Sequence, residues 1–374
     1  MAQLGACAAA IVALENVAPG VQGTTFGNIG AVKALRDPEA LQGLSVLTEG
    51  ELLGKSTDTV ATVERTAAGL PKVRIRHYGN INAASVTTPT CAADPAAAPI
   101  EDTFTLTKYL QQSFSFSVDR AKSLCGDAAR IVTNSRGMRA SVPNTPVMNE
   151  LATILRMHAR KLVQDLDKDV LLRLKSAFGV NARSTNTTAQ NIELYKADGT
   201  RTSAGIDQLM ADYRFNEGIG RPIILGGNRI VSFFESLGYG CCSLDGVDYN
   251  KINAINPYRI YFDPLVDDAT AGFGANQFAV ISAGAHKLVT ANRYTINGVQ
   301  IQRMANTSYG RVTFDELPGL QFDLAVDESG CVTPGWLFIL SLSYEVFVPP
   351  APMGAGDPLN GVNGMFRYTA TQAA

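Results

Sequence analysis

The chain has 374 residues, of which 46% are hydrophobic and 18% are charged, and its formal net charge at pH 7 is -2. A chain of this length and composition can bury a large core and should form more than one structural unit. The small net charge argues against a protein whose main task is to grip nucleic-acid phosphates, because such binding needs a clear surplus of lysine and arginine.

Cysteine and histidine are sparse and scattered. None of the six cysteines forms a CxxC pair, and the three histidines lie far apart, so neither a metal site nor a cofactor is predicted. The adjacent Cys241 and Cys242 could act as a redox pair, but packing as reduced thiols is favoured in a chain without an export signal. No apolar run reaches about 18 residues, so no membrane span is predicted. We expect synthesis in a reducing cytoplasm.

Residues 1–60 are rich in alanine, glycine and threonine and show little periodicity, which indicates an arm that becomes ordered through contacts outside itself. Within them, the stretch TEGELLGKST at 48–57 resembles a phosphate-binding loop. Such a loop needs four residues between its first glycine and the Gly-Lys pair, whereas only three separate Gly50 from Gly54. We therefore interpret the stretch as a polar turn.

A strand with one basic face is predicted near the start of the segment 61–118. In KVRIRHY, at 72–78, Lys72, Arg74 and Arg76 alternate with apolar residues, which is the period of a β-strand. These basic residues could meet an acidic patch on a neighbouring molecule, or they could simply face solvent.

The chain returns along a second predicted strand. Residues 79–102 hold few apolar anchors, and Phe114, Phe116 and Val118 then alternate with small hydroxyl residues. The two strands together predict a long, two-stranded excursion. Because an isolated two-stranded ribbon is marginal in water, we expect the excursion to lie on a neighbour.

The strongest helix signal covers 146–178 and begins at Pro146, since proline is favoured at the first helical position. The helix would span on the order of 50 Å. One stripe of it is apolar, and Arg156, Asp167 and the other charged residues are predicted to lie on the remaining faces. His158 lies near the apolar stripe and is interpreted as a core or interface histidine.

A mixed α/β pattern follows in the segment 191–330. A strand at 221–225, a turn at 226–228 and a helix come in succession. The turn could bind an anion at the start of the helix, but no lysine or hydroxyl residue completes a cradle, so a plain strand-to-helix turn is favoured. Several strand patterns follow, and the last, at 336–348, alternates like a half-buried strand before Pro349 ends it.

No nucleophile elbow, zinc-protease helix or kinase motif occurs in the sequence, so no catalytic residue is predicted. An enzyme of unknown type, with its site at the turn 226–228 or at Cys241 and Cys242, is kept as a less favoured alternative.

The order of these elements resembles that of the major capsid proteins of tailed double-stranded DNA bacteriophages, which have the α+β Hong Kong 97-type fold. The resemblance covers about residues 60–350. It rests on the excursion strands, the helix at 146–178, the segment GRPIILGGNRIVSFFESLG and the segment GWLFILSLSYEVFVPP.

The resemblance implies five parts. They are an N-terminal arm (1–60), an extended loop (61–118), a peripheral domain with the spine helix (119–190), an axial domain (191–330), and a return strand to the peripheral domain followed by a C-terminal tail (331–374).

The resemblance also implies a function. The chain would be a structural protein of the virion, assembled in the host cytoplasm from pentamers and hexamers into an icosahedral shell. The shell would enclose double-stranded DNA and contact it non-specifically on the inner face. Scaffold and portal proteins would be partners, and the resemblance leaves open whether the shell is held by cement proteins or by covalent cross-links. Inter-subunit contacts are expected at Lys72, Arg74, Arg76, Phe114 and Phe116. The shell of an encapsulin-like compartment, which would enclose a cargo enzyme, is the alternative within the same fold.

Overall fold

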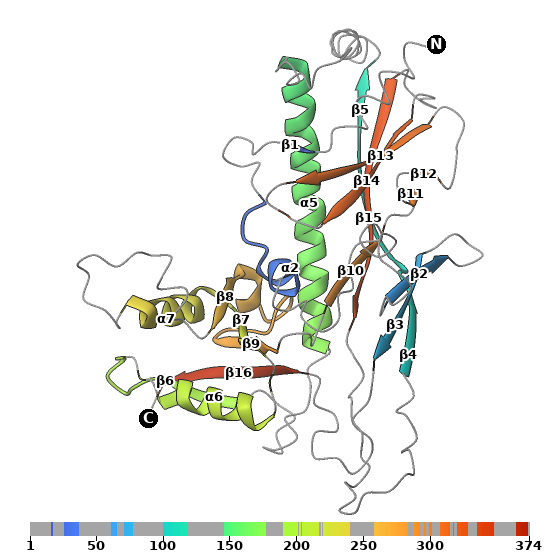
Figure 1. Cartoon of the computed structure of the whole chain (residues 1–374). Coiled ribbons are helices and arrows are strands. Elements are labelled where there is room, and N and C mark those ends of the chain that lie inside the picture. Colours follow the sequence, from blue (N-terminus) through green and yellow to red (C-terminus); the bar gives the residue numbers. More distant parts are fainter. Residues whose placement is uncertain are drawn as a thin grey trace, which may run out of the picture.

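The structure, a computed structural model, combines helices and strands around one long helix (Figure 1), and the predicted α+β class is therefore confirmed. The residues that the structure describes are 16–17, 26–36, 61–65, 71–77, 100–117, 146–176, 190–200, 202, 204–216, 218, 220–239, 258–282, 287–291, 295–296, 299–300, 307–314, 317, 320–327, 335–347 and 364–372.

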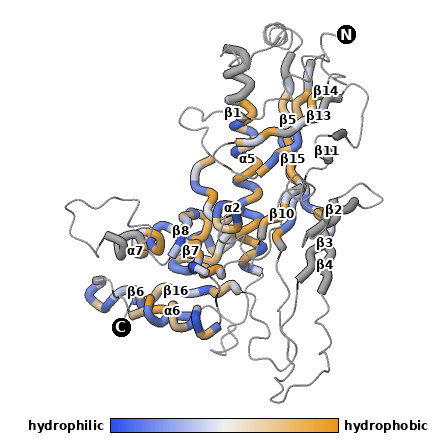
Figure 2. Tube along the Cα trace, viewed as in Figure 1, coloured by the Kyte–Doolittle hydropathy of each residue, from blue (hydrophilic) through white to orange (hydrophobic). Residues whose placement is uncertain are grey.

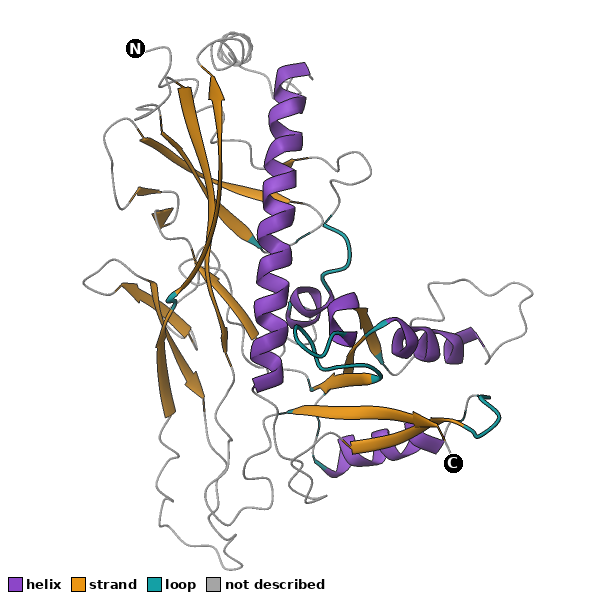
Figure 3. Cartoon of the chain, turned by 180° about the vertical axis from the view of Figure 1, so that it is seen from behind, coloured by secondary structure: helices purple, strands orange, loops and turns teal. Residues whose placement is uncertain are grey.

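Helix α5 (Pro146–Ser176) is the central element of the fold, and its 31 residues match the predicted helix to within two residues at its end. At 1.5 Å per residue it is about 46 Å long. The predicted apolar stripe is buried, with Leu155, Leu162 and Leu166 almost fully removed from solvent. The helix runs past both of the larger sheets, as the view from behind shows (Figure 3).

The first sheet lies along α5 and is organised by one long strand, β15 (Gly335–Phe347). On one side of β15 lies β5 (Lys108–Ser117), and on the other side β14 (Gln321–Asp327) and then β10 (Lys287–Ala291) pair with successive stretches of it. The sheet continues from β14 to β13 (Thr307–Phe314) and the short β1 (Asn16–Val17). Strands β11 (Thr295–Ile296) and β12 (Val299–Gln300) pair separately with each other.

Helix α5 is buried on a second side as well, where α2 (Gly30–Leu35) and the residues before it pack against it. Figure 2 shows hydrophobic residues gathered where α5, α2 and the first sheet meet. The placement of Arg156 and Asp167 on polar faces of the helix was wrong, because each is only 1% exposed. The physical reason is that the N-terminal segment covers the face that carries them.

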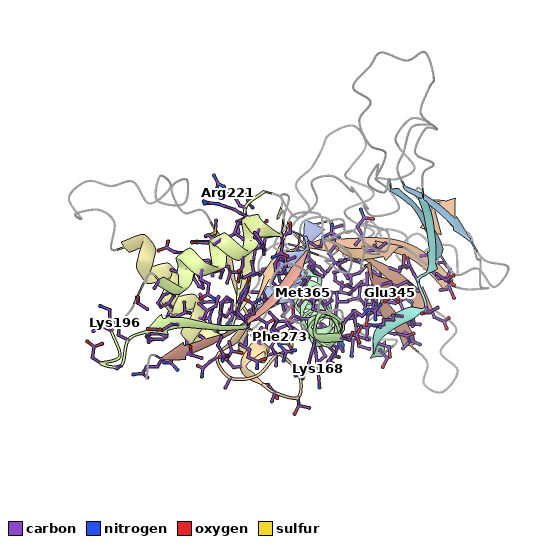
Figure 4. All side chains as sticks on the ribbon, turned by 90° about the horizontal axis from the view of Figure 1, so that it is seen from below. Lys168, Lys196, Arg221, Phe273, Glu345 and Met365 are labelled. Carbon is purple, nitrogen blue, oxygen red and sulfur yellow. The ribbon has the colours of Figure 1, made fainter. Side chains whose placement is uncertain are left out.

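The second sheet lies near the C-terminal end of α5, between two layers of helix. One face packs on α6 (Ala204–Phe215) and α7 (Asn228–Tyr239), and the other faces α2 and α5. Buried Met365 and Phe273 lie beside the end of α5, whereas Lys196 and Arg221 lie at the outer side (Figure 4). The strand order is β6 (Gln190–Tyr195), β16 (Met365–Gln372), β9 (Gln277–Ile281), β7 (Ile223–Gly226) and β8 (Arg259–Phe262).

Two features of this architecture differ from the prediction. Strand β16, in a region expected to be a C-terminal tail, lies between β6 and β9 in the second sheet. The expected two-stranded excursion is a three-stranded sheet of β2 (Ala61–Arg65), β3 (Pro71–His77) and β4 (Ile100–Thr105). The return strand is divided, because β4 pairs with β3 whereas β5 joins the first sheet.

Candidate functional site

The small sheet β2–β3–β4 is the candidate contact surface, and it stands to one side of the two larger sheets (Figures 1 and 3). Among the described elements, the extensive contacts of these three strands are with one another. The chain leaves the sheet through buried Leu106 and enters β5 directly. The sheet is therefore attached to the body at the start of β5.

One face of this sheet carries the three predicted basic residues together with two acidic ones. Lys72 lies opposite Glu64 on β2, and Arg76 lies opposite Glu101 on β4. Arg74 lies between two threonines. The register therefore pairs two of the three basic residues with acidic residues, so the predicted strand of basic residues has acidic partners. The two glutamates were not predicted, because no strand was expected at β2 and because Glu101 lies in the stretch 79–102 that was expected to connect the two strands.

The other face of the same sheet carries a row of apolar residues. Val63 on β2, Val73 on β3 and Phe104 on β4 lie opposite one another, and in the next row Ile75 lies between Ala61 on β2 and Asp102 on β4. Along each strand, these pairs alternate in register with the pairs that contain the charged residues. A three-stranded sheet with such a face is stable when the apolar face is covered.

Phe114 and Phe116, the other predicted contact residues, belong to β5 and are in register with aromatic residues of β15. Phe116 lies opposite Trp336 and Phe114 opposite Phe338. The ring of Phe114 stacks on Phe338, with centroids 5.0 Å apart, and on the imidazole of His158, with centroids 4.8 Å apart. Phe114 thus ties β5 to α5 within its own chain, and a contact to a neighbouring chain stays a prediction.

His158 is half-buried, which agrees with its interpretation as a core or interface histidine. Its imidazole stacks on Phe114. Burial lowers the pKa of His158 below its ordinary value, so the neutral ring is favoured at neutral pH.

A polar cluster holds the start of β5, where the small sheet joins the body. Lys108 Nζ lies 2.7 Å from Asp169 Oδ2 on α5 and 3.9 Å from Glu345 Oε1 on β15. The hydroxyl of Tyr344 donates a hydrogen bond to Asp169 Oδ2 at 3.0 Å. Burial, followed by the charge of Asp169, raises the pKa of Tyr344, so its hydroxyl stays protonated and continues to donate. The cluster links β5, α5 and β15 at the base of the small sheet.

The alternative anion site, at Gly226–Asn228, is filled by a side chain of the protein itself. Asp267 in the 3-10 helix η1 (Pro264–Asp267) accepts a hydrogen bond from the backbone N–H of Asn228 through Oδ2, at 3.3 Å. A side-chain carbon on Gly227 would overlap the Asp267 carboxylate, which shows how closely the two groups approach. An internal carboxylate therefore takes the place that an anion would occupy at the start of α7. The other alternative site, Cys241 and Cys242, lies outside the described residues.

Within the described ranges, no group of three or more histidine, cysteine, aspartate or glutamate side chains is arranged to hold a metal ion. In the same part of the chain, no helix is both long enough and apolar enough to cross a membrane.

Comparisons with known proteins give structural likenesses only. No family model matches the chain, and no curated protein matches it. Solved structures similar to it include the capsid of cyanophage A-1(L), at 12% identity and a TM-score of 0.42, covering 87% of this chain and 94% of that one. The capsid of the native GTA particle has 12% identity and a TM-score of 0.41, with 96% of each chain covered. The virus-like particle from Pyrococcus furiosus has 11% identity and a TM-score of 0.36, covering 86% of this chain and 94% of that one.

Proposed function

We propose that this chain is the major capsid subunit of a tailed double-stranded DNA bacteriophage, with a Hong Kong 97-type fold. Copies would assemble as pentamers and hexamers into an icosahedral shell. The observation that carries the proposal is the small sheet β2–β3–β4, whose pairing is internal and whose apolar row of Val63, Val73 and Phe104 lies on one face.

The apolar row supports a role in self-association. Full burial of a side chain of this kind contributes about 1.5–3 kcal/mol, so covering the row adds several kcal/mol to a contact between two copies. Each copy would extend its sheet onto one neighbour and receive the sheet of another. Such a head-to-tail contact closes into rings when the rotation between copies permits.

The charged face of the sheet supports specificity of the contact. Lys72, Arg74 and Arg76 share this face with Glu64 and Glu101, so the face has both signs of charge and a small positive excess. Charges at the edge of a contact mainly steer association and set its register, and they add less to affinity. We infer that Lys72, Arg74 and Arg76 orient the sheet on its neighbour. Phe114 holds the adjoining strand β5 in position through its stacking on Phe338 and His158, and we infer that Phe114 and Phe116 also contribute to the contact with the neighbour.

A structural role, with no catalysis, fits the occupied start of α7, where Asp267 fills the place considered for a ligand. The net charge of -2 suits a shell that surrounds DNA without binding it tightly, because a strongly basic inner face would retain the phosphates. We infer that double-stranded DNA is contacted non-specifically inside the shell and that scaffold, portal and cement proteins are partners. The location would be the virion, after assembly in the host cytoplasm.

The test compares two neighbouring residues of β4 that lie on opposite faces, Phe104→Ala on the apolar face and Thr103→Ala on the charged face. Truncating an aromatic anchor in a contact weakens it by about 2 kcal/mol or more, so the concentration needed for assembly should rise more than tenfold for Phe104→Ala. Thr103→Ala should assemble as the unchanged chain does. Sedimentation and negative-stain microscopy measure assembly, and thermal unfolding of the subunit checks its stability.

Normal shells from Phe104→Ala would contradict the proposal. A large fall in the subunit's own unfolding temperature would also contradict it, because the face would then be covered within one chain. The content of the particles decides between the two kinds of shell: nuclease-protected DNA supports a capsid, whereas a co-purified enzyme without DNA favours an encapsulin-like compartment.

A further inference from the structure

The short helix α2 begins without a capping side chain of its own. Ile29 occupies its N-cap position and makes no side-chain hydrogen bond to the helix. Two carboxyl groups from distant parts of the chain accept the free backbone N–H groups instead. Asp263 Oδ2 accepts from the N–H of Ala31 at 3.2 Å, and Asp167 Oδ1 accepts from the N–H of Val32 at 2.9 Å. The start of α2 is therefore held by α5 and by the residue that follows β8.

The segment 26–36 fits closely into this position. Phe26, Ile29 and Leu35 are at most 2% exposed. A side-chain carbon on Gly30 would lie 2.5 Å from the carbonyl oxygen of Phe262, so only glycine lets α2 approach the end of β8 this closely. The N–H groups and the two carboxyl groups are thus brought together by packing as well as by hydrogen bonds.

The hydrogen bonds indicate which carboxyl group carries a proton. Asp263 accepts through both oxygens, since Oδ1 also receives the N–H of Leu265 at 2.9 Å. Asp167 accepts through Oδ1, whereas its Oδ2 is buried and receives no hydrogen bond. Two adjacent buried carboxylates would repel each other, so a proton on Asp167 is favoured. Consistently, burial first and Asp263 second raise the pKa of Asp167 to about 9.

We propose that Asp167 and Asp263 share one proton and form a latch that holds the segment 26–36 against α5 and β8, and that loss of this proton releases the segment. The proposal does not rest on the proposed function. It assigns to the chain an alkaline-sensitive release of its N-terminal segment.

The other charged groups on the surrounding elements either interact with other partners or lie at a position on their helix or strand that is away from Asp167 and Asp263. Lys33 on α2 is exposed and donates to the carbonyl oxygen of Gly27 at 3.5 Å. On α5, Lys168 is exposed and Asp169 pairs with Lys108. The remaining groups are Asp267 of η1, which accepts from Asn228, Arg36 at the far end of α2, Arg259 at the opposite end of β8, and Lys287 opposite Phe347 at the start of β10. Asp263 is the charged group that acts on Asp167.

The direction of the pH effect follows from proton linkage. In the released state Asp167 meets water and regains an ordinary pKa near 3.8, so release is accompanied by loss of one proton. The released fraction should then rise about tenfold for each pH unit up to about pH 9, where the latched state loses the proton too. Above that pH the dependence should level off.

The test is hydrogen–deuterium exchange of the full chain between pH 6 and pH 10, with each rate divided by the intrinsic amide rate at the same pH. For the segment 26–36, the resulting protection should fall about tenfold per pH unit up to pH 9, while α6 (Ala204–Phe215) serves as internal reference. In Asp167→Asn the amide can replace the shared proton, so protection should not depend on pH. Asp263→Asn also pairs an amide with a carboxyl group, so its protection should likewise not depend on pH. Asp165→Asn, which changes the same charge on the exposed part of α5, should behave as the unchanged chain does.

Protection that stays constant with pH in the unchanged chain would overturn the latch, and so would an equal pH dependence in Asp167→Asn. If neither asparagine variant folds, the pH dependence of protection in the unchanged chain still tests the latch. Loss of protection confined to the segment 26–36 supports the latch, whereas equal loss in α6 contradicts it.

Discussion

Replacing Phe26 with alanine should weaken the attachment of the N-terminal segment more than any other single truncation in it. The ring is 2% exposed, meets Phe314 edge-on with centroids 5.0 Å apart, and lies 5.6 Å from the guanidinium carbon of buried Arg156. Phe314 lies 5.8 Å from the same carbon, so the two rings surround one cation. Removing a buried phenylalanine side chain lowers the free energy of unfolding by about 3–5 kcal/mol, and the lost cation–π contact falls within that range.

That loss corresponds to an increase of roughly two to four powers of ten in the opening of the segment 26–36, since each 1.4 kcal/mol is a factor of ten. Hydrogen–deuterium exchange of the segment measures the opening, and urea unfolding of the subunit measures the global effect. Phe215→Ala is the matched control, because Phe215 is 52% exposed and its loss should change stability by less than about 0.5 kcal/mol. A Phe26→Ala variant within 0.5 kcal/mol of the unchanged chain would refute the reasoning.

Three further outcomes are expected. Asp267→Ala removes the cap of α7 at Asn228 and should lower the unfolding free energy by about 0.5–2 kcal/mol in urea titrations, and no change would show that the cap is dispensable. The pKa of Asp167 is raised on folding, so its contribution to stability is full below about pH 4 and is lost as the pH rises towards 9. Between pH 5 and pH 8 the unfolding free energy of the unchanged chain should therefore fall by about 1.4 kcal/mol per pH unit relative to that of Asp167→Asn. Parallel pH profiles of the two proteins would contradict this. Leu162→Ala should cost about 2–5 kcal/mol by thermal or urea unfolding, whereas Leu172→Ala, at a site 40% exposed, should cost under about 1 kcal/mol.

Local signals in the sequence were sufficient for the long helix. Proline at the first helical position and leucines at helical spacing act within a few residues, and they place α5 to within two residues of its end. The basic alternation at Lys72, Arg74 and Arg76 likewise gives the strand β3. What a local pattern cannot show is the partner strand, and for this reason Glu64 and Glu101 were missed.

Long-range contacts account for the other differences. Ala31 is 232 positions from Asp263, and Val32 is 135 positions from Asp167, so no local spacing links them. A charged residue on a helix is by default assigned to solvent, and the burial of Asp167 follows only once α2 has been placed over it. Strand β16 was overlooked because its short stretch follows a Gly-rich region and its burial depends on two strands from elsewhere in the chain.

The position of β16 has a consequence for the time course of synthesis. Within the second sheet, β6 pairs with β16 alone, and β16 follows every other strand of that sheet along the chain. While the ribosome is making residues 196–364, β6 has no hydrogen-bonding neighbour in the sheet, and the edge of β9 that pairs with β16 is also without its partner strand. Translation of residues 365–372 therefore supplies the strand that joins the two parts, so the second sheet can be completed only after all of its other strands have been made.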